Sequence, residues 1–439
     1  MWTVTGDEVY RRNAVQVLRT WAGMDPERYA YFPDAHIHTG HPLYQFLMAA
    51  EIIRATRPLA DDTPGTYGGY DVVWSATDDR RLLTNFADPV VTTFLHSNTR
   101  WMNQHNFGLF GRLATAIYAD DAAGYATGVE WFTVNSAYPG YDNGALAPQI
   151  PLLEVDDPDN PYGHDIVQVR EMGRDQAHGE CNIDNFTGLA RILEVQGTRV
   201  DPGAGTVSTR ADAVSSYDFL GRRLLAGANA FYGFMLGAWV PWADERGEGW
   251  DGTVSQAYRG RLFNPVNELF YEYAPERGVD VATEAPWLAR LSERRDGPYF
   301  HNGTAVTNFW APGDKNPEYW VAFPAELAGT APPARPASAD LPFARWGLPL
   351  DDRTEIVDGV ARAHVTPRGT TGVVTRVMHD GNGSNALLVR ADGAATLEVL
   401  DKEPASPRNP DGGHRARPAA GNGWRRPPAR CYGRRMYTR

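Results

Sequence analysis

Cysteine is scarce in this chain, which has two among its 439 residues, Cys181 and Cys431. Two cysteines cannot form a framework of several disulfides, and neither has the close spacing of a metal-binding pair. The cysteines therefore do not indicate a compartment. Long apolar runs are absent too: no stretch of about eighteen apolar residues occurs, which argues against a membrane-spanning helix. We expect no membrane partner.

The start of the chain lacks the features of a secretory signal. Its first ten residues, MWTVTGDEVY, contain neither a basic region nor an apolar stretch. They already have the pattern of the middle of a helical segment, so we expect that the natural start lies further upstream.

Positive charge is scarce over most of the chain. The formal net charge is −12, and the stretch from Ser406 to the end holds nine arginines against one aspartate. Removing that +8 from −12 leaves −20 on the other residues. An acidic body argues against a nucleic-acid partner. If the substrate is an anionic polymer, arginines must be concentrated locally where it binds.

Helical periodicity dominates the first part of the chain. The segment GDEVYRRNAVQVLRTWAG places apolar residues near a helical period, and DDAAGYATGVEWF repeats its order of acid, aromatic and apolar turn. Further helical segments follow at 43–53, 186–193 and 219–236. Repeated helical hairpins over about 300 residues predict a mainly α domain at 1–324, an (α/α) toroid or incomplete barrel. A generic helical bundle is the alternative that periodicity leaves open.

The composition changes after that domain. A Pro/Ala-rich stretch, 325–342, predicts a linker. Short alternating runs separated by Gly, Asn and Asp then predict a small β module of a few strands at 343–405. From 406 to 439 Arg, Pro and Gly predominate and aliphatic residues are nearly absent, so we expect a disordered basic tail.

The segment with the most chemical content is EMGRDQAH, residues 171–178. As a helix it would place Glu171, Arg174, Asp175 and His178 at i, i+3, i+4 and i+7, on one face. Charges of both signs beside a histidine, followed by an apolar run, are typical of the wall of a substrate cleft. A solvated helix face with ion pairs is the other interpretation.

These eight residues resemble the E-S-G-R-D-Q-G-H signature of the alginate-lyase-like helical polysaccharide lyases, closest to polysaccharide lyase family thirty-eight. Further elements resemble that family in the same order over residues 5–300. They are Gly6-Asp7-Glu8-x-Tyr10 with Trp21, Ala50-Glu51-Ile52-Ile53-Arg54, Asn106-Phe107-Gly108 and Arg259-Gly260-Arg261. The resemblance implies an (α/α) toroid, a glucuronan or alginate lyase without a cofactor, and a secreted or periplasmic location.

Such a lyase removes the proton at C5 of a 4-linked uronate, which is weakly acidic until the neighbouring carboxylate is neutralised. It needs donors for that carboxylate, a base for the proton and an acid for the leaving oxygen. His178 fits the base or the neutralising group, and Glu171 would set its charge state or orientation. By resemblance, Asn106 would donate to the carboxylate. Arg174 and Asp175 fit a structural ion pair as well as a substrate-binding wall.

The catalytic acid of related lyases is a tyrosine downstream of the histidine, near an arginine-bearing turn. By that resemblance Tyr258 is the first candidate for this acid, and Tyr232 and Tyr271 are the reserve candidates. We also expect Tyr232 and Tyr271 to bind substrate. The chain departs from the family pattern at Asn267, where the resemblance leads us to expect a tyrosine at the start of a helix. The other residues that we expect to bind substrate are Arg174, Arg259, Arg261, Asn103 and Gln176.

Three alternatives remain open. Asp34-Ala35-His36-Ile37-His38 resembles a metal motif of amidohydrolases, but that motif needs a β-strand, whereas this segment leads into a helix, so we expect no metal. A glycoside hydrolase on an (α/α) barrel would need two carboxylates facing each other across the substrate, and Glu171 and Asp175 are one helical turn apart. A non-catalytic carbohydrate-binding relative would use some of the 13 Trp and 20 Tyr for stacking on sugars. Nothing in the sequence indicates the oligomeric state.

Overall fold

The computed structural model describes residues 8–56, 66–67, 70–245, 250, 252–259 and 265–293, together with eight short strands between 347 and 438. The described part is mainly helical, which confirms the predicted α class. The chain divides into two compact units. One consists of residues 1–149 and 188–221, and the other of residues 150–187 and 222–439.

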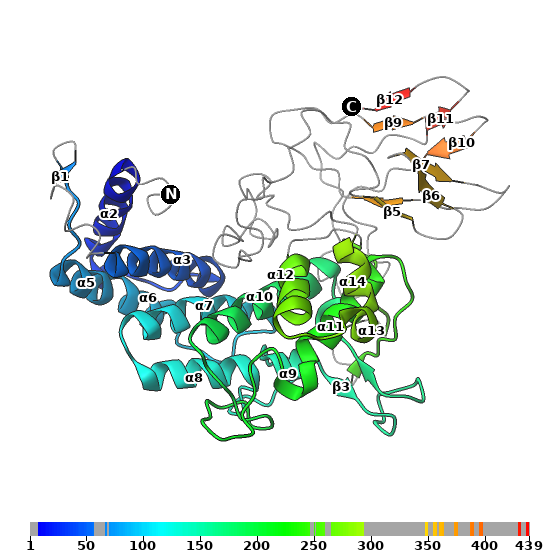
Figure 1. Ribbon diagram of the computed structural model, residues 1–439, viewed down its shortest axis with the longest axis horizontal. Coiled ribbons are helices and arrows are strands. Elements are labelled where there is room, and N and C mark those ends of the chain that lie inside the picture. Colours follow the sequence, from blue (N-terminus) through cyan, green and yellow to red (C-terminus); the bar gives the residue numbers. More distant parts are fainter. Residues whose placement is uncertain are drawn as a thin grey trace. The chain divides into compact units, whose positions relative to one another are not determined.

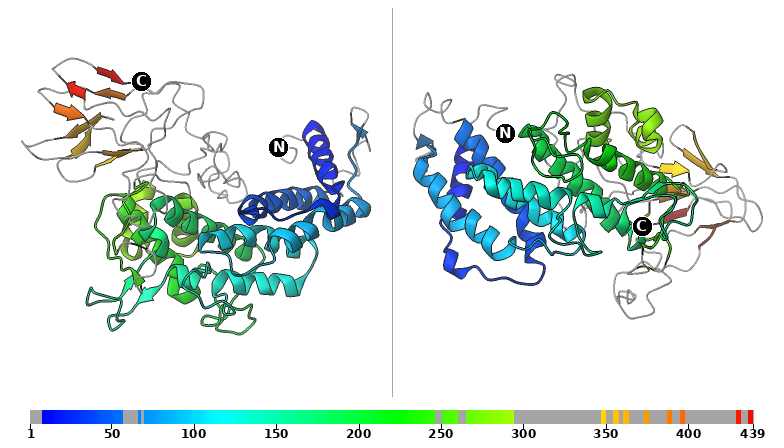
Figure 2. Two further views of the ribbon diagram at one scale, coloured as in Figure 1. Left: turned by 180° about the vertical axis from the view of Figure 1, so that it is seen from behind. Right: turned by 90° about the horizontal axis from the view of Figure 1, so that it is seen from below.

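Helices predominate in the first unit (Figure 1). In it α3 packs on α7 and α7 on α8, and these helices run side by side (Figure 2). The predicted helices near the start of the chain and from Asp120 are present as α2 and α8. The elements are α2 (Glu8–Ala22), η1 (Pro26–Arg28), α3 (Ala35–Ala55), the antiparallel strands β1 (Thr66–Tyr67) and β2 (Tyr70–Asp71), α5 (Ala76–Leu82), η2 (Leu83–Ala87), α6 (Asp88–Phe94), α7 (Asn103–Tyr118), α8 (Ala122–Thr133) and α9 (Leu146–Gln149).

Glycines set the distance between α3 and α7. A Cβ on Gly40 would lie 2.0 Å from the carbonyl oxygen of Phe107 and 2.9 Å from Cα of Gly108. A Cβ on Gly111 would lie 2.7 Å from the carbonyl oxygen of Gly40. Backbone atoms cannot rotate away as a side chain can. The two helices therefore approach so closely because these positions lack a side chain.

A proline explains the π-helical turn η2 between α5 and α6. Pro89 has no N–H, so the carbonyl of Asn85, four residues earlier, receives no helical hydrogen bond from it. That oxygen instead accepts from the hydroxyl of Tyr29 at 3.1 Å. The widened turn thus leaves a carbonyl to which the segment before α3 is fastened.

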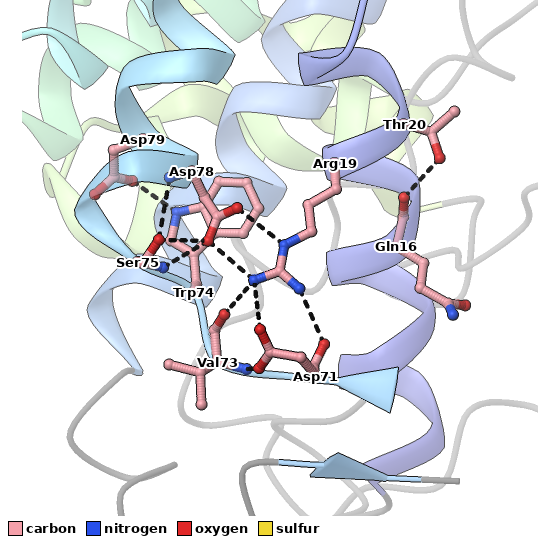
Figure 3. Close-up of polar contacts among 9 residues, drawn as sticks. All are labelled: Gln16, Arg19, Thr20, Asp71, Val73, Trp74, Ser75, Asp78 and Asp79. Carbon is pink, nitrogen blue, oxygen red and sulfur yellow. Dashed lines mark hydrogen bonds and ion pairs between the residues drawn. The ribbon is translucent and has the colours of Figure 1, made fainter. Parts of the chain in front are cut away.

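Arg19 of α2 fastens the segment between β2 and α5 (Figure 3). Its Nε and Nη2 donate to the carboxylate of Asp78 at 2.9 and 3.0 Å, and Nη1 donates to the main-chain oxygen of Asp71 at 3.1 Å. Asp78 also closes a capping box with Ser75 at the start of α5. Burial alone would raise the pKa of Asp78, but hydrogen bonds from Arg19 and Ser75 lower it below its ordinary value.

Arg19→Ala is expected to lower the free energy of unfolding by about 1–3 kcal/mol, because it leaves the buried Asp78 carboxylate without its guanidinium partner. Thermal unfolding followed by circular dichroism measures the change. The difference from the unaltered protein should shrink as the pH falls, because the folded-state pKa of Asp78 is depressed and protonation removes the ion pair. Arg28→Ala is the control: Arg28 pairs with Asp25 on the exposed surface, where loss should cost less than about 0.5 kcal/mol. Equal losses at the two arginines would contradict this account.

The second unit contains most of α10 and α11, which each also have residues in the first unit. Within it α14 packs on α12 and α13. Its helical and early strand elements are β3 (Leu152–Leu153), β4 (Ile166–Val167), η3 (Arg170–Gly173), α10 (Gln176–Val195), α11 (Phe219–Met235), α12 (Pro265–Tyr271), η5 (Glu272–Glu276), α13 (Val281–Glu284) and α14 (Pro286–Glu293).

Short strands follow in the C-terminal part of the chain. They pair antiparallel as β5 with β8, β6 with β7, β9 with β12 and β10 with β11. Six of them lie in 343–405, where a β module is predicted, whereas β11 and β12 lie inside the predicted disordered tail. The predicted linker, 325–342, lies outside the described residues. The strands are β5 (Gly347–Pro349), β6 (Thr354–Val357), β7 (Val360–Ala363), β8 (Val373–Thr375), β9 (Leu387–Val389), β10 (Ala395–Leu397), β11 (Ala429–Cys431) and β12 (Met436–Thr438).

Candidate functional site

The signature segment is not one helix. Arg170–Gly173 forms the 3₁₀ turn η3, and α10 begins at Gln176. The residues that we expected on a single helical face are therefore divided between two elements and their connection, which corrects that prediction. Asp175 explains the break: its Oδ1 accepts from the main-chain N–H of His178 at 2.9 Å, so its side chain caps α10 and starts a new helix there.

Asp175 also holds the imidazole of His178. Its Oδ2 lies 2.6 Å from Nδ1, and the His178 side chain is 8% exposed. Burial alone would raise the pKa of Asp175, but hydrogen bonds from the side chain and the main-chain N–H of His178 lower it. An ionised Asp175 requires a proton on Nδ1, so Nε2 is the basic nitrogen of the neutral ring. We expected the carboxylate of Glu171 to orient His178. The carboxylate that contacts Nδ1 of His178 is instead that of Asp175.

Glu171 is fully buried and holds two other groups. Its Oε2 accepts from Nδ2 of Asn182 on α10 at 2.9 Å, and its Oε1 lies 3.4 Å from Nη1 of Arg174. The predicted ion pair of Arg174 with Asp175 is thus an ion pair with Glu171. Because the Arg174 side chain is 29% exposed, its guanidinium offers a cation to a ligand close to the start of α10.

A loop from far along the chain is fastened to this segment. Gln176 donates from Nε2 to the main-chain oxygens of Met172 at 2.9 Å and Ser255 at 2.7 Å. Its N–H donates to the oxygen of Ala257 at 3.0 Å. Gln176 is fully buried, so we assign it to positioning this loop rather than to binding substrate. These bonds bring Tyr258, the next residue, to the first turn of α10.

Tyr258 has a strained backbone. Its φ is 62°, in the left-handed region that residues other than glycine adopt rarely, and its side chain is half-buried. Strain of this kind is concentrated at functional sites, where surrounding contacts hold it in place. Tyr258 is the one tyrosine with a positive φ among the described residues, and its catalytic role stays a prediction.

Arg259 is held by the main chain of its own unit. Its Nε donates to the oxygen of Phe234 at 2.8 Å and its Nη2 to the oxygen of Ala238 at 3.0 Å, at the C-terminal end of α11. Its guanidinium also lies 4.0 Å from the centroid of the Phe234 ring. Burial lowers the pKa of Arg259. These bonds give Arg259 a structural role, because the carbonyls at a helix end need donors. Substrate binding by Arg259 stays a prediction.

The reserve tyrosines differ in exposure. Tyr232 is fully buried in α11, with its ring 5.4 Å from that of Phe231, so a polymer cannot reach it in this conformation. Tyr271, at the end of α12, is half-buried. Arg261 lies outside the described residues, as does the side chain of Asn267.

Tryptophans pack against the turn η3, which the sequence indicated only through composition. Trp242 donates from Nε1 to the main-chain oxygen of Val169 at 3.1 Å. A Cβ on Gly173 would lie 2.4 Å from the Trp242 ring and 2.7 Å from that of Trp250. The glycine of the signature therefore has a packing role, since it admits two indoles against the backbone.

A third tryptophan is exposed in the same unit. Trp239 is 75% exposed, and its ring centroid lies 5.8 Å from that of Tyr162. It follows Ala238, the residue whose carbonyl accepts from Arg259. An exposed indole connected in this way to the loop of Tyr258 fits stacking on a sugar ring.

The two asparagines expected at the site lie in the first unit, on α7. Asn103 is 3% exposed and Asn106 is fully buried. Met102, just before α7, has a φ of 44°, so this segment also contains a strained residue. His178, Arg174 and the loop of Tyr258 are described together in the second unit, whereas substrate contact by Asn103 and Asn106 stays a prediction.

His105 lies between these asparagines and is fully enclosed. Its Nε2 donates to the main-chain oxygen of Trp131 at 2.9 Å, which leaves Nδ1 as the acceptor of a neutral ring. Burial lowers the pKa of His105 to about 4, although the bond to Trp131 acts in the other direction.

We expect His105 to make the protein sensitive to acid. Above pH 6.5 the ring is neutral in both folded and unfolded chains, and below it the unfolded chain binds the proton more readily. Stability is therefore lost as the pH falls from 6.5 toward the folded-state pKa of about 4, by about 3 kcal/mol in total for the difference between these values. Melting temperatures measured between pH 6.5 and about pH 4 test this predicted loss of stability. His105→Gln should melt with a flatter pH dependence, and an unchanged slope would assign the acid sensitivity to other groups.

The segment of the amidohydrolase-like motif is helical: Ala35–Ala55 is the single helix α3, so the strand that such a motif requires is not formed there. Among the described residues no group of three or more His, Cys, Asp and Glu side chains is arranged to hold a metal ion. No helix in the described part of the chain combines the length and apolar character needed to cross a bilayer.

Comparison with known proteins gave no relative. No family model matches the chain, and neither the curated proteins nor the solved structures include one that is significantly similar. The residues and contacts described above therefore carry the functional argument.

Proposed function

We propose that this chain is a polysaccharide lyase that cleaves a 4-linked uronic-acid polymer, glucuronan or alginate, by β-elimination. We further propose that its helical hairpins form an (α/α) toroid. The observation that carries the functional proposal is the pair of Asp175 and His178. Asp175 holds the imidazole through Nδ1 and so directs Nε2 away from itself, on a segment to which the loop of Tyr258 is hydrogen-bonded.

Nε2 of His178 is buried in this conformation, so the proposed reaction requires the substrate to gain access to it. Nε2 then removes the proton at C5 of the sugar. The electron pair of that C–H bond forms the C4–C5 double bond, and the C4–O bond breaks. Tyr258 donates its hydroxyl proton to the departing oxygen, which leaves as a new sugar hydroxyl. Arg174, partly exposed beside Glu171, neutralises the sugar carboxylate and so lowers the barrier to forming the anionic intermediate.

The carboxylates of this segment support a lyase better than a glycoside hydrolase. A hydrolase needs a protonated carboxylic acid whose pKa is raised, opposite a second carboxylate. Contacts with His178 lower the pKa of Asp175, and Glu171 is buried against Asn182 and Arg174. Neither group is arranged to protonate a glycosidic oxygen.

The test is absorbance at roughly 235 nm, where unsaturated uronates absorb, during incubation with glucuronan, alginate, hyaluronan and pectate. We expect a rise with a 4-linked uronate polymer, which identifies β-elimination and the substrate together. New reducing ends without absorbance would replace this proposal with a hydrolase. Binding without either signal would leave a carbohydrate-binding protein.

A further inference from the structure

Two aromatic rings are exposed next to each other in the first unit. Tyr31 and Phe32, shortly before α3, are 44% and 47% exposed. Phe94, at the end of α6, supports both, with ring centroids 6.4 Å from Tyr31 and 6.1 Å from Phe32. A pair of exposed rings backed by a buried one is a preformed surface for stacking.

A cation lies against this surface. The guanidinium of Arg100 is 4.9 Å from the centroid of the Tyr31 ring. Within the described part of the chain it makes no hydrogen bond or ion pair, and its Nε is buried without a partner. Among the described residues no acidic side chain pairs with this half-buried guanidinium, although the chain as a whole has a net charge of −12. Its planar fork of N–H donors matches the two oxygens of a carboxylate.

His36 fixes Tyr31 without adding charge. Its Nδ1 accepts from the Tyr31 hydroxyl at 3.1 Å, and its Nε2 donates to Oε1 of Gln104 at 3.2 Å. Burial lowers the pKa of His36, the charge of Arg100 lowers it further, and Asp34 acts in the opposite direction. The ring therefore stays neutral at neutral pH, and Arg100 supplies the positive charge that a ligand meets beside Tyr31.

We propose that Tyr31, Phe32 and Arg100 form a binding subsite for an acidic sugar of the polymer. The sugar carboxylate binds the guanidinium, and the C–H face of the ring stacks on the exposed aromatic rings. The choice of a uronate as ligand rests on the proposed function. The subsite is distinct from the pair of Asp175 and His178, which belongs to the other unit.

Isothermal titration calorimetry on the full chain tests this subsite. His178→Gln is used as the background so that no oligosaccharide is consumed. The probes are tetrasaccharides of glucuronan and alginate, and cellotetraose, which has a 4-linked backbone without carboxylates. We expect a uronate tetrasaccharide to bind. Arg100→Gln should weaken its affinity by about tenfold or more and should change any affinity for cellotetraose little. Tyr31→Ala should weaken the uronate as well.

Arg112→Gln is the matched control, because Arg112 also stacks on an aromatic ring, 4.3 Å from the centroid of the less exposed Trp131. The Arg112→Gln variant should bind the uronate tetrasaccharide with an affinity within about twofold of that of the His178→Gln background. Unchanged affinity in a folded Arg100→Gln protein, or no uronate binding at all, would overturn the subsite. If the unaltered protein then still releases unsaturated uronates, the proposed function stands. Binding that depends on Arg100 without lyase activity would instead preserve the subsite and remove the lyase.

Discussion

His178→Gln should reduce the rate of unsaturated uronate formation by about a hundred- to ten-thousand-fold. Glutamine occupies a similar volume, but it cannot take the C5 proton at neutral pH. The measurement is the initial rate of absorbance increase with the polymer that the native protein cleaves. Because the side chain is largely buried, circular dichroism must show that the variant is folded.

Asp175→Asn separates catalysis from helix capping. The asparagine Oδ1 can still accept from the N–H of His178, so the cap on α10 and the melting temperature should be preserved. An amide cannot stabilise the imidazolium that forms when Nε2 takes a proton. We therefore expect a large loss of kcat and a shifted pH profile. Full activity in both folded variants would remove His178 from the mechanism.

Gly40→Ala is expected to destabilise the first unit by about 3 kcal/mol or more, with loss of soluble protein as the visible result. The new methyl group would lie 2.0 Å from the carbonyl oxygen of Phe107, far inside van der Waals contact. Relief requires α3 and α7 to separate, which would open the packing between them. The yield of soluble protein and its melting temperature measure the effect.

Gly108→Ala is the matched control on the facing helix. The nearest atom to its methyl group would be Cδ2 of Leu95 at 3.9 Å, an ordinary contact. Alanine is the better helix former by about 1 kcal/mol, so this variant should be as stable as the native protein or more so. Similar losses in both variants would show that close approach at Gly40 does not determine the packing of α3 on α7.

Local patterns predicted the helices well. The apolar period of the first segment corresponds to α2, which buries Val15 and Leu18 but leaves Trp21 40% exposed. The repeat after Asp120 corresponds to α8. These predictions succeed because an amphipathic stripe must face a core whichever element it packs against. The break before Gln176 was missed, although Asp175 is a good N-cap residue. Helical spacing alone cannot distinguish a continuous helix from a turn followed by a new cap.

Contacts between distant segments could not be predicted from the sequence. The hydrogen bonds from Gln176 to residues 255 and 257 join segments about eighty positions apart, and no local pattern indicates them. The main-chain partners of Arg259 were not predicted for the same reason. An arginine beside a glycine resembles a ligand-binding group, whereas its actual partners are main-chain carbonyls of α11.

The way in which Gln176 holds its loop has a consequence for how this protein can change through evolution. Its acceptors at positions 172, 255 and 257 are main-chain oxygens, which every amino acid possesses. Substitutions in the loop can therefore alter its chemistry without removing these acceptors, whereas the bonds to residues 172 and 255 depend on the glutamine side chain. Selection for a new sugar can act on the loop first, and a library that varies Thr253, Val254 and Gln256 while keeping Gln176 would explore the same freedom in the laboratory.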